Sequence, residues 1–276
     1  MSDTDTIHEY GSGIGDDEVA RLEAQDHLLA QSTRIIFTEA GIRPGMRVLD
    51  LGCGTGNATF VAADLVGPGG SVVGLDHSPE ALARARLRAG QRGLAHVQLI
   101  EGDMHDPAPG GPYDAIVEQL ALYQDPDPAE VLRRQATVLR PGGLIVPVES
   151  DLAGAYTEPE VPMSTQLHSW MVESFAKAGL TLIGRRLWAI LEEAGLRPLG
   201  MIGIQPHVGP GDEVRLAAGV EAVRNLVPVF VGTGVATAEE VGVETWAQRV
   251  RDEWERTRYV FGQPMALGAW ATTGPE

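Results

Sequence analysis

Short apolar runs and longer amphipathic segments alternate through the middle of the chain, and this pattern predicts its elements. Apolar runs are typical of buried strands, and they lie at 48–49, 71–76, 97–100, 113–118 and 144–148. Segments with helical spacing follow several of them, from 58 onward, at 81–89 and at 129–139. Because consecutive parallel strands need a crossover connection, usually a helix, the alternation predicts an α/β fold around a right-handed parallel sheet.

Further elements are expected on both sides of this central pattern. An apolar stripe up to residue 40 predicts a leading helix that starts near 16 and ends at Gly41 and Pro44. Downstream, the pattern predicts a helix over 182–194, a strand over 197–205, a helix from the capping box at 237–240 to about 258, and a last strand over 261–272.

Two stretches, 150–181 and 206–236, lie outside the regular alternation. Both contain large apolar side chains, namely Tyr156, Met163, Trp170, Met171, Phe175, Leu226, Val229 and Phe230. In α/β enzymes, insertions after the carboxyl ends of strands carry specificity, so the two stretches are expected to form helical caps that wall a ligand pocket. The alternative is that these side chains only extend a core.

The stretch 48–57 contains the motif around which the chain is organised. An apolar strand end is followed by Asp50, by glycines at 52, 54 and 56, and then by a helix start. Glycine is needed where the backbone takes a positive φ or lets a ligand approach closely. A strand, a glycine-rich turn and a helix N-terminus form the ligand-binding end of an open α/β sheet.

The spacing of these glycines differs from the dinucleotide pattern G-x-G-x-x-G, and the preceding acid would repel a pyrophosphate. An acid suits a ligand with an amino group. The motif from Asp50 to Gly56 resembles the first motif of the class I S-adenosylmethionine-dependent methyltransferases, and the turn at 138–143, Val-Leu-Arg-Pro-Gly-Gly, is a second mark of that family. The resemblance covers about 40–205. It implies a doubly wound, Rossmann-like sheet of seven mostly parallel strands, with the last strand antiparallel between strands five and six, and S-adenosylmethionine as the cofactor.

Acids at successive strand ends extend the predicted cofactor site. Asp76 follows the second strand, near the position of an acid that binds ribose hydroxyls in nucleotide-binding α/β folds. The resemblance implies that Asp103 binds the adenine amino group and that Met104 lies against the ring. The predicted cofactor-binding residues are Asp50, Gly52, Gly54, Gly56, Asn57, Asp76, His77, Asp103, Met104, Glu118 and Gln25. For His77, an ordinary turn position is an equal alternative.

Composition narrows the classes of partner. The net charge of −17 argues against a nucleic-acid substrate, because phosphate binding needs a basic surface. No apolar run approaches the length of a membrane span and the first residues do not resemble a secretory signal, so a cytoplasmic protein is expected. The single cysteine, Cys53, favours the same compartment and is expected to be a small turn residue. Glu149 and Asp151 lack a neighbouring histidine cluster, so no metal is predicted.

Methyl transfer depends mainly on alignment, and a general base is needed only if the acceptor must lose a proton. The candidate bases near the expected mouth of the site are Glu149, Asp151, His168 and His207. Of these, His168 is predicted to be catalytic, with a structural role as its alternative. Residues 1–40 are expected to form a helical lid over a methyltransferase domain at 41–276, either in cis or exchanged within a homo-oligomer. Tyr10 on this lid is a second catalytic candidate, through its π face.

Three functions compete on the sequence alone. The first is methylation, on carbon or oxygen, of a bulky apolar or aromatic small molecule of secondary metabolism. The second is a cofactor-binding cyclase of the same fold, in which methylation triggers or is replaced by cyclisation. The third is a dinucleotide-dependent dehydrogenase, which the glycine spacing and Asp50 disfavour.

Overall fold

The computed structural model describes residues 29–178 and 183–274. The described chain divides into two compact units. The sheet unit contains Leu29–Ser150, Ile183–Gly203 and the described residues from Ala266 onward. The helical unit contains two described segments, residues 151–178 and Ile204–Met265. Each unit has its own sheet and its own core, and they are described in turn.

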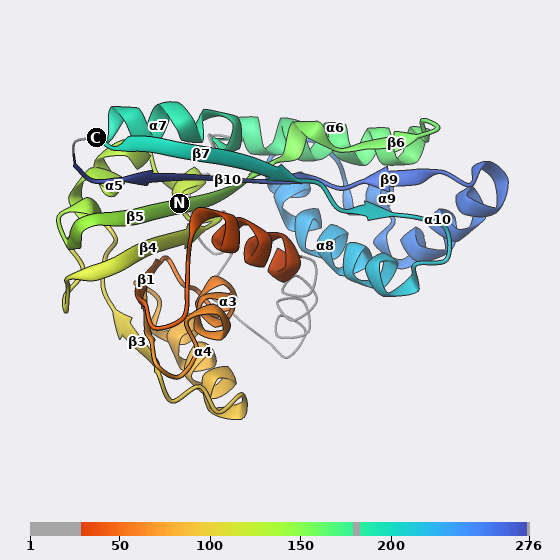
Figure 1. The fold of residues 1–276 in the computed structure, drawn as a ribbon. Helices are drawn as coiled ribbons and strands as arrows, with labels where there is room; N and C mark the ends of the chain where they lie inside the picture. The colour runs from red at the N-terminus through yellow and green to blue at the C-terminus, as the bar shows by residue number, and fades with distance from the viewer. Residues whose placement is uncertain (1–28, 179–182, 275–276) are drawn as a thin grey trace. The chain divides into compact units, whose positions relative to one another are not determined.

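The sheet unit is built on seven strands in the order β3-β2-β1-β4-β5-β10-β7 (Figure 1). Their bounds are β1 Arg47–Leu51, β2 Ser71–Asp76, β3 Val97–Glu101, β4 Tyr113–Gln119, β5 Leu139–Asp151, β7 Arg197–Ile204 and β10 Met265–Thr272. The pairs β1–β2, β1–β4, β2–β3 and β4–β5 are parallel. The arrow of β10 runs against that of β5 (Figure 1). The expected mostly parallel, Rossmann-like sheet is confirmed, including the place of its last strand.

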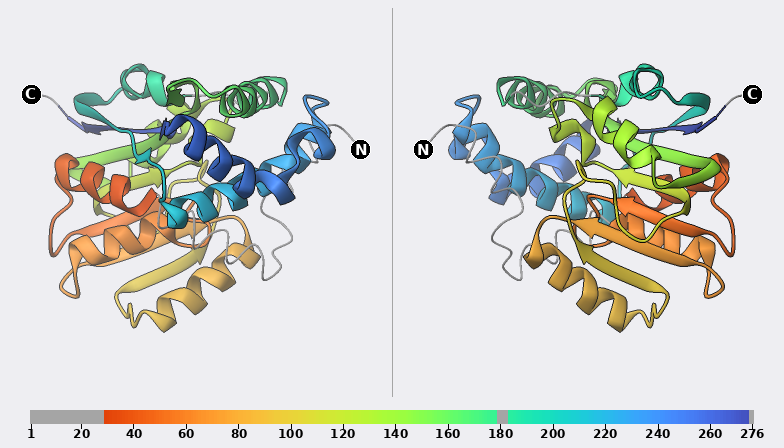
Figure 2. Two further views of the ribbon diagram at one scale, coloured as in Figure 1. Left: turned by 90° about the vertical axis from the view of Figure 1, so that its right-hand side faces the viewer. Right: turned by 90° about the vertical axis from the view of Figure 1, so that its left-hand side faces the viewer.

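Helices cover both faces of this sheet. Residues 29–40 are helical, and the further helices are α3 Asn57–Val66, α4 Pro79–Gln91, α5 Pro128–Ala136 and α7 Leu187–Glu193, with 3-10 turns η2 Leu122–Gln124 and η4 Gly184–Arg186. The helix 29–40, α3 and α4 lie on one face, and α5 and α7 on the other (Figure 2). Local sequence starts α4 and α5 in the same way, since Ser78 and Asp127 accept a hydrogen bond from the third helical amide and a proline follows each.

The helix 29–40 is an integral part of the sheet unit. Ile36 and Phe37 are fully buried. A Cβ atom at Gly268 of β10 would lie only 2.1 Å from Ile36 Cγ2, so the helix packs directly on that strand. Gln119 Nε2 also donates a hydrogen bond to Thr33 Oγ1 at 2.5 Å. The last third of the predicted lid, whose boundary was placed at residue 40, therefore covers the sheet face, while residues 1–28 lie outside the described chain.

The helical unit holds the rest of the described chain. Its elements are η3 Leu152–Gly154, β6 Tyr156–Glu158, α6 Pro162–Lys177, β8 His207–Val208, α8 Glu213–Gly232, α9 Ala238–Val241, α10 Val243–Thr257 and β9 Val260–Gly262. The short strands form a separate sheet in the order β6-β9-β8. No described helix is both long enough and apolar enough to cross a membrane.

The helical unit has a hydrophobic core of its own. Phe230 is fully buried among Trp246, Trp254 and Tyr259, and the ring of Trp170 lies 6.2 Å from that of Phe230. Met163, Met171 and Leu226 pack against the same cluster. For these residues the alternative that the apolar stretches extend a core is confirmed. Because α9 and α10 share this core, the unit continues beyond the predicted stretch 206–236.

Several predicted elements are wrong in their bounds: the helix expected over 182–194 is the turn η4 followed by α7, and the strand expected over 144–148 is the longer β5. Three further differences have a local reason. The helix expected over 129–139 ends at Ala136, since Leu139 pairs with Tyr113 as the first residue of β5. The capping box at Thr237 is present, but its helix ends at Gly242, whose φ of 59° closes α9 before α10 begins. The strand expected over 261–272 is divided into β9 and β10, which belong to different sheets.

Candidate cofactor site

The glycine-rich turn joins β1 to α3 with three positive φ values, 64° at Gly52, 50° at Gly54 and 98° at Gly56. A Cβ at Gly52 would lie 2.6 Å from Ala121 Cβ, and one at Gly56 would lie 2.5 Å from Phe60. Gly54 differs, because a Cβ there would meet no described atom within 4 Å. Two of the glycines are therefore required by packing, and the third leaves open space at the turn.

Asp50 lies beneath this turn and is completely buried. Its Oδ2 accepts a hydrogen bond from Thr59 Oγ1 at 2.5 Å, while its Oδ1 is buried without a hydrogen-bond partner among the described residues. Burial raises the pKa of this carboxyl to about 7, with the Thr59 hydrogen bond opposing the effect and the charge of Asp76 adding to it. An orphaned acceptor with a raised pKa fits a ligand that brings a positive donor.

Asp76 connects the turn to the next strand end. Its Oδ2 accepts a hydrogen bond from the Gly54 amide at 2.7 Å, and its Oδ1 accepts one from the Ser78 amide at 2.9 Å. The neighbouring His77 is exposed, with Nδ1 3.7 Å from Asp76 Oδ1. Asp76 thus fixes the position of the open glycine. Each carboxylate oxygen keeps a second lone pair, which could accept a hydrogen bond from a ribose hydroxyl. The predicted contact of Asp76 with ribose stays a prediction.

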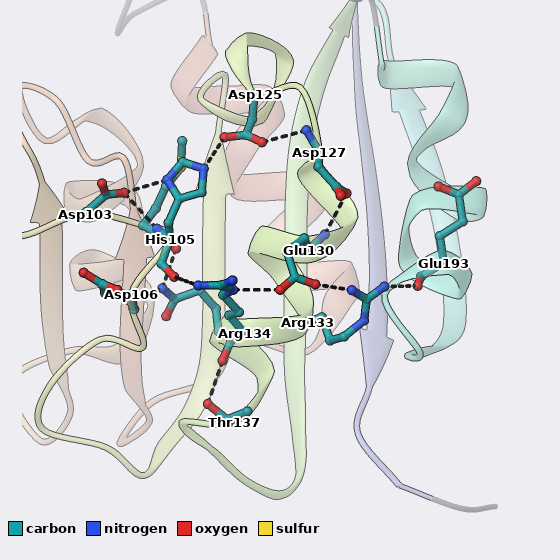
Figure 3. Close-up of polar contacts among 12 residues, drawn as sticks. Asp103, His105, Asp106, Asp125, Asp127, Glu130, Arg133, Arg134, Thr137 and Glu193 are labelled. Atoms are coloured by element: carbon teal, nitrogen blue, oxygen red, sulfur yellow. Dashed lines mark hydrogen bonds and ion pairs between the residues drawn. The ribbon is translucent and has the colours of Figure 1, made fainter.

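Asp103 and Met104 follow β3, as predicted, and their surroundings include a residue that the sequence did not single out. His105 donates to Asp103 Oδ1 from its backbone amide at 2.9 Å and from Nδ1 at 2.7 Å. Its Nε2 lies 2.7 Å from Oδ2 of Asp125 (Figure 3). These bonds lower the pKa of Asp103 and, with the charge of Asp125, raise the pKa of His105. Gln135 Nε2 holds the carbonyl of Met104 at 2.7 Å.

A pair of buried glutamates lies at the ends of β4 and β5. Glu118 Oε1 accepts hydrogen bonds from the amides of Ala121 at 2.6 Å and Leu122 at 3.1 Å, and Glu149 Oε1 accepts one from Tyr123 at 3.0 Å. Burial raises the pKa of Glu118 to about 7. Burial and the charge of Glu118 raise the pKa of Glu149 well above its usual range. Glu118 was predicted as a site residue, whereas the pairing with Glu149 was not.

Asn57 and Cys53 have structural surroundings. Asn57 begins α3, and its Oδ1 accepts a hydrogen bond from Arg88 Nη1 at 3.0 Å. Cys53 is buried, and burial raises the pKa of its thiol, so it stays protonated and is no nucleophile. The expectation that Cys53 is a small turn residue agrees with this environment.

A family model described as a methyltransferase domain matches residues 42–195, more than half of the chain and nearly all of the first part of the sheet unit. This chain is an S-adenosylmethionine-dependent methyltransferase. Among curated relatives, the methyltransferase is 34% identical over 221 residues to nocamycin O-methyltransferase from Saccharothrix syringae, a match that covers 77% of this chain and 72% of that protein. The family match decides against the dehydrogenase interpretation.

A second group of relatives matches a shorter part of the methyltransferase. Demethylmenaquinone methyltransferase from Geobacillus sp. (strain WCH70) is 36% identical over 110 residues, which are 40% of this chain and 47% of that protein. The chain therefore spans about half the length of such relatives.

Solved structures share the fold. A methyltransferase from Aquifex aeolicus has a TM-score of 0.53 at 16% identity, covering 88% of this chain and 91% of that one. The 4+2 cyclase SpnF has a TM-score of 0.52 at 22% identity, covering 89% and 81%. At such identities the likeness concerns the fold alone, and it shows that this fold also occurs in a cyclase.

The residues of the turn fit S-adenosylmethionine. This cofactor supplies a methyl group on a sulfonium and carries an amino group but no phosphate. The orphaned Oδ1 of Asp50 is an acceptor for an ammonium group, and the open space at Gly54 admits a ligand next to the backbone. Among the described residues, no group of three or more histidine, cysteine, aspartate or glutamate side chains is placed to hold a metal ion.

The two catalytic candidates, His168 and Tyr10, belong to other segments of the chain. His168 belongs to α6 of the helical unit, where its Nε2 lies 2.8 Å from the Leu152 carbonyl. It lines a cavity of about 390 Å³ within that unit, together with Tyr156, Ser164 and Phe261. Since a carbonyl only accepts, Nε2 carries the proton, and in the neutral ring Nδ1 is an acceptor without a hydrogen-bond partner among the described residues. Tyr10 and Gln25 lie outside the described residues.

Proposed function

We propose that the methyltransferase acts on an oxygen atom of a small molecule of secondary metabolism. The observation that carries the proposal is the similarity to nocamycin O-methyltransferase, which extends over 72% of that protein and well beyond the 42–195 segment common to the family. The demethylmenaquinone methyltransferases match only about 40% of this chain, so their acceptors are weaker guides.

In this proposal the sheet unit binds the cofactor through the ends of β1 to β4. Asp50 receives the amino group, the backbone at Gly52, Gly54 and Gly56 approaches the ligand, and Asp76 binds the ribose. Asn57, His77, Asp103, Met104 and Glu118 complete the predicted site. The support is the orphaned carboxylate oxygen at Asp50 and the Asp76 bond that holds Gly54 in place.

The helical unit supplies the acceptor site in the same proposal. Its cavity combines the aromatic rings of Tyr156 and Phe261 with the hydroxyl groups of Thr157, Ser164 and Thr165, with the carboxyl groups of Glu158 and Glu160, and with His168. Such a lining suits an acceptor with an apolar or aromatic body and a hydroxyl group. When bound, S-adenosylmethionine would supply the methyl group, and its C–S bond would break with the electron pair left on sulfur as the new O–C bond formed. The hydroxyl proton passes to Nδ1 of His168.

The proposal also covers the class of acceptor, the cellular compartment and the oligomeric arrangement. The net charge of −17 supports a small-molecule acceptor over nucleic acid. We propose a cytoplasmic enzyme that uses no metal ion. Its N-terminal helix covers either its own active site or, by exchange in a homo-oligomer, the site of a partner subunit.

The test is a methylation assay with mass analysis of the products. Purified protein is incubated with S-adenosylmethionine and a panel of phenols, enols and carboxylic acids, with peptide and RNA as controls. The expected product is a small molecule heavier by one CH2 group, formed together with S-adenosylhomocysteine. A product isomeric with the acceptor would instead indicate a cyclase. Methylation of peptide or RNA alone would overturn the proposal.

The role of His168 has its own readout. In His168→Gln, kcat is expected to fall by about 10²-fold or more while the KM for the cofactor is unchanged, because the loss is that of a general base. The loss should shrink for acceptors whose hydroxyl is already ionised at the assay pH. An equal loss for all acceptors would indicate a structural role instead.

A further inference from the structure

The ring of His105 lies between two carboxylates that come from different loops (Figure 3). Nδ1 is 2.7 Å from Oδ1 of Asp103, and Nε2 is 2.7 Å from Oδ2 of Asp125. Ionised carboxylates only accept hydrogen bonds, so both ring nitrogens must carry protons for both contacts to form. The geometry is therefore that of an imidazolium, and a neutral ring satisfies one carboxylate only.

The two carboxylates are held unequally. Asp125 has a side chain that is 5% exposed, and its Oδ1 accepts a hydrogen bond from the Asp127 amide at 2.8 Å, next to the start of α5. Asp103 has a side chain that is 61% exposed. Asp125 is the fixed end of the bridge, and Asp103 is the exposed end, which the backbone amide and the ring of His105 hold together.

The backbone around His105 is held independently of its ring. Gln135 Nε2 donates to the carbonyls of Met104 and Asp106, both at 2.7 Å, and Arg134 Nη1 donates to the His105 carbonyl at 3.3 Å. Loss of one ring proton therefore leaves the loop and the amide bond to Asp103 in place, and it removes one of the two contacts of the ring with carboxylates. Both described bonds to Asp103 reach Oδ1, which leaves Oδ2 to accept a hydrogen bond from a ligand.

We propose that His105 is a positioning residue, which in its protonated form holds the Asp103 carboxylate toward the cofactor and makes cofactor affinity depend on pH. This rests on the proposed function, in which Asp103 binds the adenine amino group. His105 itself touches no part of the cofactor in this proposal. It acts by fixing the direction of Oδ2 on an otherwise exposed side chain.

The carboxylates around the ring favour its protonated form. Asp103 and Asp106 come from its own loop and Asp125 from the loop before α5, while Arg134 faces the His105 carbonyl from α5. His77, after β2, is near enough to act on the charge of Asp103. The hydrogen bond to Asp103 and the charge of Asp125 raise the pKa of His105 against partial desolvation. The bridge is thus complete below the ordinary histidine pKa and is lost as pH rises through the raised value.

The test measures dissociation constants of S-adenosylmethionine by calorimetry from about pH 6 to about pH 9, for the wild-type chain, for His105→Gln and for the control His96→Gln. His96 is a histidine of the same unit whose Nε2 contacts only the Ala63 carbonyl among the described residues. The ratio of His105→Gln to wild type at each pH cancels the titration of the cofactor's own amino group.

We expect His105→Gln to bind the cofactor about three- to tenfold more weakly near pH 6 and equally near pH 9, with His96→Gln matching the wild type throughout. Asp125→Asn should move the midpoint of the wild-type profile to lower pH, since it removes the charge that favours the imidazolium. A ratio that does not change with pH overturns the inference and leaves the proposed function standing. Absence of cofactor binding by the wild-type chain at every pH overturns the proposed site, and the inference with it.

Discussion

At the scale of single residues, the cofactor site concentrates carboxyl groups where water is excluded. Asp50, Glu118 and Glu149 are all at most 2% exposed, and the pKa of each is raised. An acid whose pKa is higher in the folded than in the unfolded chain destabilises the fold as it ionises. The unliganded protein therefore holds unfavourable charge that a cationic ligand relieves.

Asp50→Asn tests this conflict between stability and binding. The folded pKa of about 7 lies above the ordinary value of 3.8, so the aspartate lowers stability progressively as pH rises through this window. The variant should gain up to about 4 kcal/mol in the free energy of unfolding near pH 8 and less near pH 5, by denaturant titration. It should also bind S-adenosylmethionine about 1.5–3 kcal/mol more weakly. Equal gains at both pH values would contradict the assigned cause.

Asp76→Asn tests the bond between the second strand end and the turn. The amide keeps the size of the side chain but cannot accept from both the Gly54 and Ser78 amides. Cofactor affinity should fall by about 1–3 kcal/mol in calorimetry, since both the turn and the proposed ribose contact weaken. Unchanged affinity in a folded variant would remove Asp76 from the site.

At the scale of elements, the sequence specifies what is local and misses what depends on pairing. The strand 71–76 was predicted with the bounds that it has, because Gly70 and Ser78 delimit it. Asp50, Asp76 and Asp103 could be predicted as one group because each lies at a strand end, and parallel strands end at one edge of the sheet. The break at Gly242 was missed because a helix of 20 residues and a corner between two helices share the same apolar spacing.

The side-chain contacts that the sequence did not predict follow the same rule. Glu118 and Glu149 meet because β4 pairs with β5, which brings together residues 31 positions apart in sequence. His105 was missed because its second partner, Asp125, lies on another loop. Its first partner is two residues away, and a histidine next to a strand-end acid was the available signal.

The glycine turn yields a prediction with a matched control. Gly54 and Gly93 have φ values of 50° and 66°, and a Cβ at either would meet no described atom within 4 Å. Gly54→Ala and Gly93→Ala should therefore each lose about 1–2 kcal/mol of stability from backbone strain. Only Gly54→Ala should lose cofactor binding, because its methyl group enters the proposed ligand space. Equal binding by the two variants would place the cofactor elsewhere.

At the scale of the whole molecule, the chain consists of a sheet unit and a helical unit whose segments are interleaved in sequence. The helical unit follows β5 and then β7 along the chain, and β10 returns to the sheet after it. Sequence patterns place such insertions well, since each interrupts the strand–helix alternation. They do not show whether apolar side chains face a ligand or a core, which here required the cluster around Phe230.

Two N-terminal truncations distinguish residues that the sheet unit needs for folding from residues that act only as a lid. Deletion of residues 1–40 should prevent folding, because it removes Ile36 and Phe37, both fully buried, and each such loss costs about 2–5 kcal/mol. Deletion of residues 1–15 should leave the protein folded and lower turnover, because Tyr10 and the first part of the predicted lid are lost. Full activity of the shorter deletion would show that the segment is no lid.

A mixing experiment then distinguishes a lid in cis from an exchanged one. The 1–15 deletion keeps an intact His168, and a full-length His168→Gln chain keeps an intact N-terminus, so neither alone is expected to be fully active. If the segment covers a partner's site, mixed dimers combine an intact lid with an intact base, and turnover of the mixture exceeds the sum of the two components. If it covers its own site, activities add at every ratio, and size-exclusion chromatography of the mixture shows whether dimers were present to be tested.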